Sequence, residues 1–430
     1  MRGLWWVVSL VSVVAPLGAE VVALKAARLF DGKSDRVQAP GMVVVDGSKI
    51  AALGPAAAVP AGARVIELGD ATLLPGFMDA HTHLSGERSE DAMRDMVEEV
   101  TRTLPEKVLR AGMLARRTLM AGLTTVRDLG SEEFVDVGLR DAIRRGYVEG
   151  PRMLVAVRGI GTTGGHCDPT NGFVFGLLDP RQESPAVANG PDGMRAAVRW
   201  NVKYGADVIK TCATGGVLSL NDDVDSAQLT QEEMAALVEE AHGKGKKAAA
   251  HAHGAEGAKR AVRAGIDSIE HGSFLDEEAL RMMAQRGTCY VPTLMATRGI
   301  REVLEKGGRM DPRTERKARR AMESVDGTVR KAIAMGVRIA FGTDAGVYPH
   351  GRNAEEFALL VERGMRPADA LRAATSVDAE LFGLADRLGT LEAGKLADIV
   401  AVPGNPLSDI RATEQVLFVM KEGRIYKGGK

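Results

Sequence analysis

A regular alternation of short apolar segments with helical segments is the feature that most constrains the fold of this 430-residue chain. Eight apolar segments each precede a helical segment, and they begin at Leu73, Leu123, Met153, Ala206, Lys247, Ser268, Thr288 and Val337. Short apolar runs predict buried strands, and strands that alternate with helices predict a parallel sheet. Eight such units in about 300 residues are typical of a (β/α)8 TIM barrel, an α/β fold whose active site lies at the carboxyl ends of the strands.

Both ends of the chain show a different pattern. Residues 20–72 contain short apolar runs separated by Asp-Gly, Gly-Ser and Pro-Ala-Gly turns, and residues 385–430 contain similar runs with Gly423 in a turn. These runs predict β-hairpins. Neither end is large enough to bury a sheet face alone. We therefore expect both ends to form one small β-sandwich beside a barrel domain that spans residues 73–384.

Residues 1–19 have the layout of a secretory signal peptide. Arg2 precedes an apolar run from Leu4 to Val14, and small residues follow up to Ala19. The alternative is a buried N-terminal strand or helix. Because the run is too short to span a bilayer comfortably, we expect cleavage near Ala19, export to the periplasm or the medium, and no stable membrane span.

Charge and cysteine content exclude two further classes of protein. The chain has 56 Lys and Arg against 57 Asp and Glu, without a long block of one sign, so nucleic acid is not an expected partner. Cys167, Cys212 and Cys289 are too few and too scattered for a disulfide framework, and they leave room for one bridge. We interpret all three as small buried or loop residues without a catalytic role.

Reactive side chains gather at the expected carboxyl ends of the strands. His81 and His83 share one face of a strand because side chains alternate with period two. Two neighbouring imidazoles can chelate one metal ion, but an isolated H-x-H also occurs as hydrogen-bonded or solvent-facing histidines. The other candidates at strand ends or in the loops that follow are His166, Lys210, His251, His253, His271 and Asp344.

These residues lie in ordered motifs that resemble those of the amidohydrolase superfamily. The motifs are Pro75-Gly76-Phe77-Met78-Asp79-Ala80-His81-Thr82-His83, Val208-Ile209-Lys210, His251-Ala252-His253-Gly254, Ile269-Glu270-His271-Gly272 and Gly342-Thr343-Asp344-Ala345. The closer resemblance is to the branch of prolidase-like and imidazolonepropionase-related enzymes, which includes ochratoxin-hydrolysing amidohydrolases. It covers nearly the whole chain after residue 19.

The resemblance implies a binuclear metal centre. His81, His83 and Asp344 would hold one divalent ion, His251 and His271 a second, and Lys210, carboxylated by CO₂, would bridge them. We expect zinc. A carbamate suits this role because an ammonium group cannot bind a cation. A hydroxide between the ions would attack an amide carbonyl, and Asp344 would pass its proton to the departing amine. The structural alternatives are an ion-paired Lys210 and a helix-capping Asp344.

The resemblance also implies which residues contact the substrate. His253 and His166 would contact the substrate carbonyl or carboxylate, with His253 close enough to assist catalysis; the alternative is that they orient the metal ligands. Prolidase-like relatives often have a tyrosine near the position of Leu218, so Leu218 argues against strict prolidase specificity. The predicted substrate is a dipeptide or an N-acyl amino acid, preferably with an aromatic acyl group of the ochratoxin type. Because relatives form large homo-oligomers, we expect one here.

Two other functions stay open from the sequence. A mononuclear deaminase or cyclic-imidate hydrolase on the same barrel would use His253 as a ligand and Glu256 as a proton shuttle. Glu256 can equally begin a helix, where a carboxylate suits the helix dipole, and this function leaves His251 and Lys210 without a role. The second alternative is a non-enzymatic binding protein, although every predicted ligand position holds a competent side chain.

Overall fold

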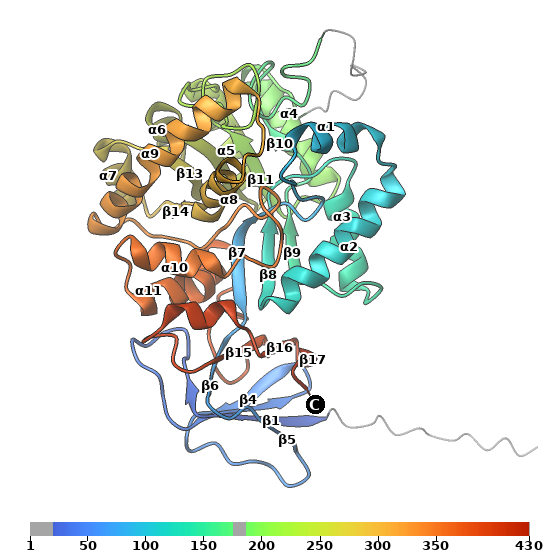
Figure 1. The fold of residues 1–430 in the computed structure, drawn as a ribbon, viewed down its shortest axis with the longest axis vertical. Coiled ribbons are helices and arrows are strands. Elements are labelled where there is room, and N and C mark those ends of the chain that lie inside the picture. The colour runs from blue at the N-terminus through green and yellow to red at the C-terminus, as the bar shows by residue number, and fades with distance from the viewer. Residues whose placement is uncertain (1–19, 175–185, 430) are drawn as a thin grey trace, which may run out of the picture.

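The computed structural model describes residues 20–174 and 186–429. It comprises a larger α/β unit and two β-sheets packed at one end of it (Figure 1). The predicted signal peptide, residues 1–19, lies outside the described residues. None of the helices in the described ranges combines the length and apolar character that a membrane-spanning helix needs.

The two sheets at the end of the molecule contain the predicted terminal strands. One has the order β4-β3-β1-β5, from β1 (Val21–Ala26), β3 (Gly41–Asp46), β4 (Lys49–Leu53) and β5 (Arg64–Glu67). The other has the order β17-β16-β15-β6-β2, from β2 (Arg28–Leu29), β6 (Ala71–Pro75), β15 (Ile399–Pro403), β16 (Phe418–Lys421) and β17 (Arg424–Lys427). Buried side chains from both sheets, among them Leu24, Leu73 and Phe418, form one apolar cluster. Both ends of the chain therefore share one core.

The stretch from Leu73 to Leu84, predicted as one strand, contains two. β6 pairs antiparallel with β15, whereas β7 (Phe77–Thr82) pairs parallel with β8 (Leu123–Asp128). Gly76 separates them, and it lies so close to the side chain of Thr124 that a Cβ atom would overlap with it. The predicted boundary after residue 72 thus falls inside β6, and β7 leads from the end sheets into the larger unit (Figure 1).

The larger unit contains two parallel sheets. They are β7-β8-β9, with β9 at Arg152–Val155, and β10-β11-β12-β13-β14, with strands Gly159–Ile160, Val208–Cys212, Lys247–Gly254, Ser268–Phe274 and Cys289–Val291. Hydrogen bonds connect these sheets on both sides. Asp207 N donates to Val155 O over 2.8 Å.

On the other side, the predicted eighth strand, residues 337–341, lies between β14 and β7. It is an extended segment with a single bridge, Tyr290 to Ile339, and not a regular strand. Ala340 N donates to Tyr290 O over 2.9 Å, and Ala80 N donates to Phe341 O over 2.8 Å. The segment therefore contacts both sheets through its backbone.

Helices cover the outside of these strands (Figure 1). They are α1 (Ala92–Thr101), α2 (Leu104–Met120), α3 (Val135–Arg144), α4 (Gly190–Lys203), α5 (Gln231–Gly243), α6 (Ala255–Ala264), α7 (Glu277–Arg286), α8 (Leu294–Glu305), α9 (Pro312–Ala334), α10 (Glu355–Glu362), α11 (Pro367–Arg372) and α12 (Asp378–Leu381). The sequence predicts one charged helical span from roughly Glu90 to Ala121. The structure divides this span into α1 and α2, since Pro105 lacks an N–H group and fits only the first turn of a helix.

Candidate metal centre

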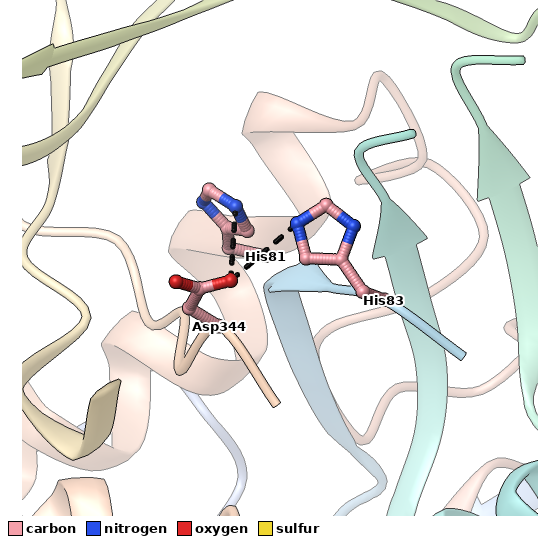
Figure 2. A group of neighbouring side chains, drawn as sticks. All are labelled: His81, His83 and Asp344. Carbon is pink, nitrogen blue, oxygen red and sulfur yellow. Dashed lines mark ion pairs between the residues drawn. The ribbon is translucent and has the colours of Figure 1, made fainter. Parts of the chain in front are cut away.

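Three predicted ligands meet at the carboxyl end of β7. His81 lies on β7, His83 directly after it, and Asp344 after residues 337–341 (Figure 2). Nε2 of His81 lies 3.5 Å, and Nε2 of His83 3.4 Å, from Oδ1 of Asp344. One ligand atom from each residue lies within 4.8 Å of the other two. Two imidazoles and a carboxylate at this spacing are a suitable donor set for one divalent ion.

Lys210 lies beside this group. It is buried on β11, and its Nζ lies 3.5 Å from Nε2 of His81. Burial lowers the pKa of the Lys210 ammonium, although the charges of Glu270 and Asp344 oppose this effect. The same burial raises the pKa of the Asp344 carboxyl, opposed chiefly by Lys210. The Lys210 ammonium therefore loses its proton more easily than that of an exposed lysine.

His251 on β12 and His271 on β13, the residues predicted for the second ion, lie next to the first group. Their ring centroids are 4.5 Å apart, and the His271 ring is 4.9 Å from that of His81. The rings thus form one continuous cluster across β7, β12 and β13.

Each of the four predicted histidine ligands has one ring nitrogen engaged by the protein. The pairs are His81 Nδ1 with Glu270 Oε2 at 3.0 Å, His83 Nδ1 with Gly130 O at 3.0 Å, His251 Nε2 with Gly215 O at 3.1 Å, and His271 Nδ1 with Thr293 Oγ1 at 2.8 Å. Such contacts orient an imidazole and leave its other nitrogen for a metal ion. Burial lowers the pKa of all four rings, so they are neutral and can donate a lone pair. The donor set therefore fits a divalent metal.

The backbone is strained at this site. His271 has a φ of 71°, Asp344 of 58°, and Thr293, which contacts the His271 ring, of 49°. The left-handed region costs a residue with a Cβ atom about 1–2 kcal/mol. Surrounding contacts fix these conformations; for example, Asp344 N donates to His81 O over 2.7 Å. Strain of this kind is characteristic of functional sites.

Asp79 supports the centre, a role that the sequence analysis did not assign. Its buried carboxyl group accepts hydrogen bonds from His81 N at 3.0 Å, Thr343 Oγ1 at 2.6 Å and Asn353 Nδ2 at 2.8 Å. Burial raises the pKa of Asp79 to about 6. Asp79 thereby connects β7 to the loop that carries Asp344. An acidic residue inside an apolar strand, two positions before His81, was the available signal.

Glu270 was also missed as a supporting residue. It is fully buried, and its two oxygens contact Arg127 Nη2 at 2.8 Å and His81 Nδ1 at 3.0 Å. Arg127 Nε in turn donates to Ala80 O at 2.7 Å. This buried network links β8 and β13 to the first ligand. Its only sequence signal was the position of Glu270 directly before His271.

The predicted substrate contacts surround the cluster. His253 is buried, its ring stacks on His271 at 5.0 Å, and its Nδ1 lies 2.9 Å from Ser273 Oγ. The His166 ring lies 4.2 Å from that of His251, and its buried Nδ1 has no hydrogen-bond partner within the described residues. Leu218 and Phe274 both pack against one buried apolar cluster. The Phe274 ring is 6.4 Å from that of His253.

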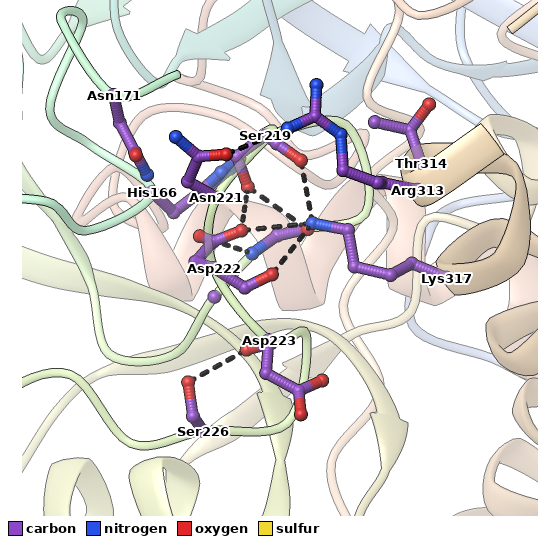
Figure 3. A network of polar contacts seen from close by, with 12 residues as sticks. His166, Asn171, Ser219, Asn221, Asp222, Asp223, Ser226, Arg313, Thr314 and Lys317 are labelled. Atoms are coloured by element: carbon purple, nitrogen blue, oxygen red, sulfur yellow. Dashed lines mark hydrogen bonds and ion pairs between the residues drawn. The ribbon is translucent and has the colours of Figure 1, made fainter. Parts of the chain in front are cut away.

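The loop after β11 is held over the cluster by a buried ion pair (Figure 3). Lys317 on α9 donates to Asp222 Oδ1 at 3.0 Å and to Ser219 O at 2.7 Å. Asp222 also accepts from Gly216 N at 3.2 Å. Sequence analysis did not find Lys317, because its partner lies 95 residues earlier.

Glu256 and the three cysteines are the remaining residues that the sequence analysis discussed. Glu256, the proton shuttle of the mononuclear alternative, is in the first turn of α6 and pairs with Arg260 at 3.0 Å. Cys167 and Cys212 form a disulfide with a Cα–Cα distance of 5.7 Å, and Cys289 is a buried free cysteine. The available bridge therefore forms close to Lys210.

Comparison with known proteins identifies the class of this chain. Residues 72–426 match the model of the Amidohydrolase family. The ligand geometry and this match together define a metallo-dependent hydrolase, and the chain belongs to the amidohydrolase family. The family generally uses divalent metals. The predicted membership is thus confirmed.

Individual relatives define the branch. Ochratoxinase from Aspergillus niger is 33% identical over 374 residues, which cover 83% of this chain and 76% of that protein. A solved Xaa-Pro dipeptidase with bound methionine is 42% identical, with a TM-score of 0.89, over 95% of this chain and 100% of that chain. A prolidase complexed with N-methylphosphonate-L-proline is 29% identical, with a TM-score of 0.85, over 95% of this chain and 99% of that chain. These neighbours imply a TIM-barrel-like fold and support amide hydrolysis.

Proposed function

We propose that the protein is a binuclear metal-dependent amidohydrolase. It hydrolyses the amide bond of N-acyl amino acids or dipeptides and releases an amino acid with a free carboxylate. The proposal rests chiefly on one observation: residues from β7, β11, β12, β13 and the loop at residue 344 form one cluster of metal-binding groups. The ochratoxinase and dipeptidase relatives support the substrate class.

Two zinc ions would supply a water of lowered pKa and polarise the scissile carbonyl. His81, His83 and Asp344 would hold one ion, and His251 and His271 would hold the other. A carbamate on Lys210 would bind both ions. To form this carbamate, the neutral Nζ of Lys210 attacks CO₂, an N–C bond forms and one proton leaves for solvent. Burial of Lys210 lowers the pKa of its ammonium group and so raises the fraction of the neutral amine that this reaction needs.

The remaining chemistry belongs to side chains of this chain. Asp344 would accept the proton of the attacking water and deliver it to the departing amine, since an amine leaves poorly unless it is protonated. His253 and His166 would orient the carbonyl and the carboxylate of the substrate. Leu218 and Phe274 offer apolar surface, which favours an aromatic acyl group of the ochratoxin type.

A release assay over N-acyl amino acids and dipeptides with varied C-terminal residues tests this function. Metal removal by a chelator should abolish release, zinc should restore it, and the active protein should bind two ions per chain. Lys210→Ala should lower metal content and reduce kcat by about a thousandfold. A single ion with an active Lys210→Ala variant, or deamination products, would favour the mononuclear alternative. No turnover across the panel by metal-loaded protein would favour a binding protein.

Two finer features of the fold belong to this proposal. The two parallel sheets and residues 337–341 would form one closed barrel of eight strand positions, in which β9 and β10 occupy one position beside β11, supported by the backbone hydrogen bonds that join the segments. The two end sheets would pack as a β-sandwich, supported by their common apolar cluster.

We also propose that copies of this chain assemble through the outer face of α1 and α2. Seven large apolar side chains are exposed there: Met96, Val97, Val100, Leu104, Val108, Leu109 and Met113. A patch of this kind usually marks an interface. Leu109→Glu, at a side chain 77% exposed, should lower the mass measured by light scattering. The matched variant Leu417→Glu, on the end sheets, should leave the mass unchanged. An unchanged mass for Leu109→Glu would count against this interface.

Export after cleavage near Ala19 is the expected localisation. Besides the leader sequence, the Cys167–Cys212 disulfide supports it, because disulfides persist in oxidising compartments. Mass spectrometry of protein from the periplasm or medium should give an N-terminus at Glu20.

A further inference from the structure

A loop beside the candidate metal centre is held by one covalent link. Residues 161–174 follow β10 and carry His166. The disulfide joins Cys167 of this loop to Cys212, the last residue of β11. Cys212 lies two residues after Lys210 and pairs in register with His251. The link therefore fixes the loop to a strand that carries a predicted metal ligand.

The surrounding chain is shaped to accept this bridge. A Cβ atom at Gly159 would lie 2.7 Å from Sγ of Cys167, and one at Gly161 would lie 2.8 Å from Cβ of Cys167. Real Cβ atoms do not approach other atoms this closely. Cys167 consequently packs directly on the backbone of β10 and the residue after it, where glycines leave the space.

Most other polar contacts of the loop maintain its own shape and not its position. Asp168 accepts hydrogen bonds from Gly164 N at 2.8 Å and Thr170 N at 2.9 Å, and Asn171 Nδ2 donates to Gly164 O at 3.0 Å. At the start of the loop, Asn189 Nδ2 donates to Thr163 Oγ1 at 2.9 Å. The part that carries His166 therefore depends on few external contacts.

His166 itself is held from two sides. Its backbone N donates to Gln228 Oε1 over 2.9 Å, and the disulfide follows at the next residue. The ring lies against Gly216, where a Cβ atom would overlap with it, and 4.2 Å from the ring of His251. Its buried Nδ1 makes no hydrogen bond to the described residues, so this nitrogen is available to a bound molecule.

We propose that the Cys167–Cys212 disulfide is a positioning element for substrate binding: it holds His166 beside the metal centre, where Nδ1 meets the substrate. This inference rests on the proposed hydrolase function. A reductant that supplies two electrons and two protons converts the bridge to two thiols, and the hydrogen bond to Gln228 and the packing of the ring against Gly216 then remain to hold His166. Because a flexible contact must be ordered at each binding event, KM should rise by about tenfold while kcat and metal content stay close to those of the oxidised enzyme.

The test compares the oxidised full-length enzyme with the Cys167→Ser/Cys212→Ser double variant. The measurements are KM, kcat, bound metal and amide hydrogen exchange over residues 161–174. Cys289→Ser, which removes the remaining cysteine and leaves the bridge intact, is the matched control. We expect faster exchange in the loop and a higher KM for the double variant alone. Unchanged exchange and unchanged KM would overturn the proposal, as would an intact mass showing that the oxidised protein carries three thiols.

A double-mutant cycle separates positioning from a general loss of stability. With His166→Ala already present, removing the bridge should change KM by no more than about twofold, since both changes act on one contact. Fully additive effects would show that the bridge does not act through His166, and would overturn the proposal. Absence of turnover in the wild-type enzyme would instead overturn the proposed function. Hydrogen exchange and the thiol count still report on the bridge in that case.

Discussion

Buried residues that are not themselves predicted metal ligands hold the candidate metal centre together. Arg127 and Glu270 are almost completely buried and form an ion pair at 2.8 Å, and Glu270 also fixes Nδ1 of His81. A buried ion pair adds little net stability by itself, but loss of one partner leaves an uncompensated charge. Loss of either member of this pair should therefore lower the stability of the fold and disturb the orientation of His81.

Glu270→Gln should accordingly destabilise the protein by about 3–5 kcal/mol, because Arg127 would lose its counter-charge. It should also lower metal content, since His81 would lose the contact that orients its ring. Urea unfolding and metal analysis measure both effects. The control Glu239→Gln, at a residue that pairs with Arg195 on the surface, should cost less than about 1 kcal/mol. Equal costs for the two variants would contradict this account.

At the scale of elements, α8 shows how a helix can depend on distant residues. Its N-cap, Thr293, is left-handed and gives no side-chain cap. Instead, Glu356 of α10 accepts hydrogen bonds from Leu294 N at 3.0 Å and Met295 N at 2.7 Å. Further along α8, Glu302 pairs with Arg352 at 2.8 Å. Contacts with residues 50 to 62 positions later in the chain thus fix both parts of α8.

The Glu302–Arg352 pair predicts a pH-dependent stability. Hydrogen bonding to Arg352 lowers the pKa of Glu302 from 4.5 to about 2. A lowered folded-state pKa contributes stability above pH 4.5, and this contribution is lost as the pH falls toward 2. Because Glu302 is partly exposed, Arg352→Gln should cost only about 1 kcal/mol at pH 6. Urea unfolding should show a smaller difference from wild type at pH 3. A difference that stays constant between these pH values would refute the prediction.

At the scale of the whole molecule, the two ends of the chain stabilise each other. Ala401 of β15 is completely buried and pairs in register with Leu73 of β6, and both lie in the apolar cluster shared by the end sheets. β6 continues through Gly76 into β7, which carries His81. The end sheets are therefore directly connected to the strand that begins the metal centre.

Ala401→Asp should destabilise the protein by more than about 3 kcal/mol, since it buries a carboxylate in an apolar cluster. Thermal unfolding of the metal-loaded protein should show a lower Tm. Leu417→Asp introduces the same side chain where the native one is 44% exposed, and its Tm should stay close to that of wild type. Similar Tm values for Ala401→Asp and wild type would mean that the end sheets unfold independently of the parallel sheets.

Local patterns predicted most elements. Periodicity predicts helices over residues 231–243 and 255–264 and a strand over residues 123–128, and α5, α6 and β8 have these bounds, because the periodicity and the flanking turns depend on adjacent residues. α8 was missed since its cap comes from Glu356 and not from a neighbouring residue. The segment that begins at Leu73 was predicted as one strand, whereas pairing with β15 before Gly76 and with β8 after it makes Gly76 the junction between two strands.

The sequence by itself determined the family, the alternation of strands and helices, and which histidines, lysine and aspartate stand at strand ends, because motif order and side-chain period are local properties. Only the tertiary structure decided which groups support them. Glu270 meets His81 across 189 residues, and Asp79 meets Thr343 across 264. Such contacts depend on how strands close in space, and no spacing within the sequence encodes them.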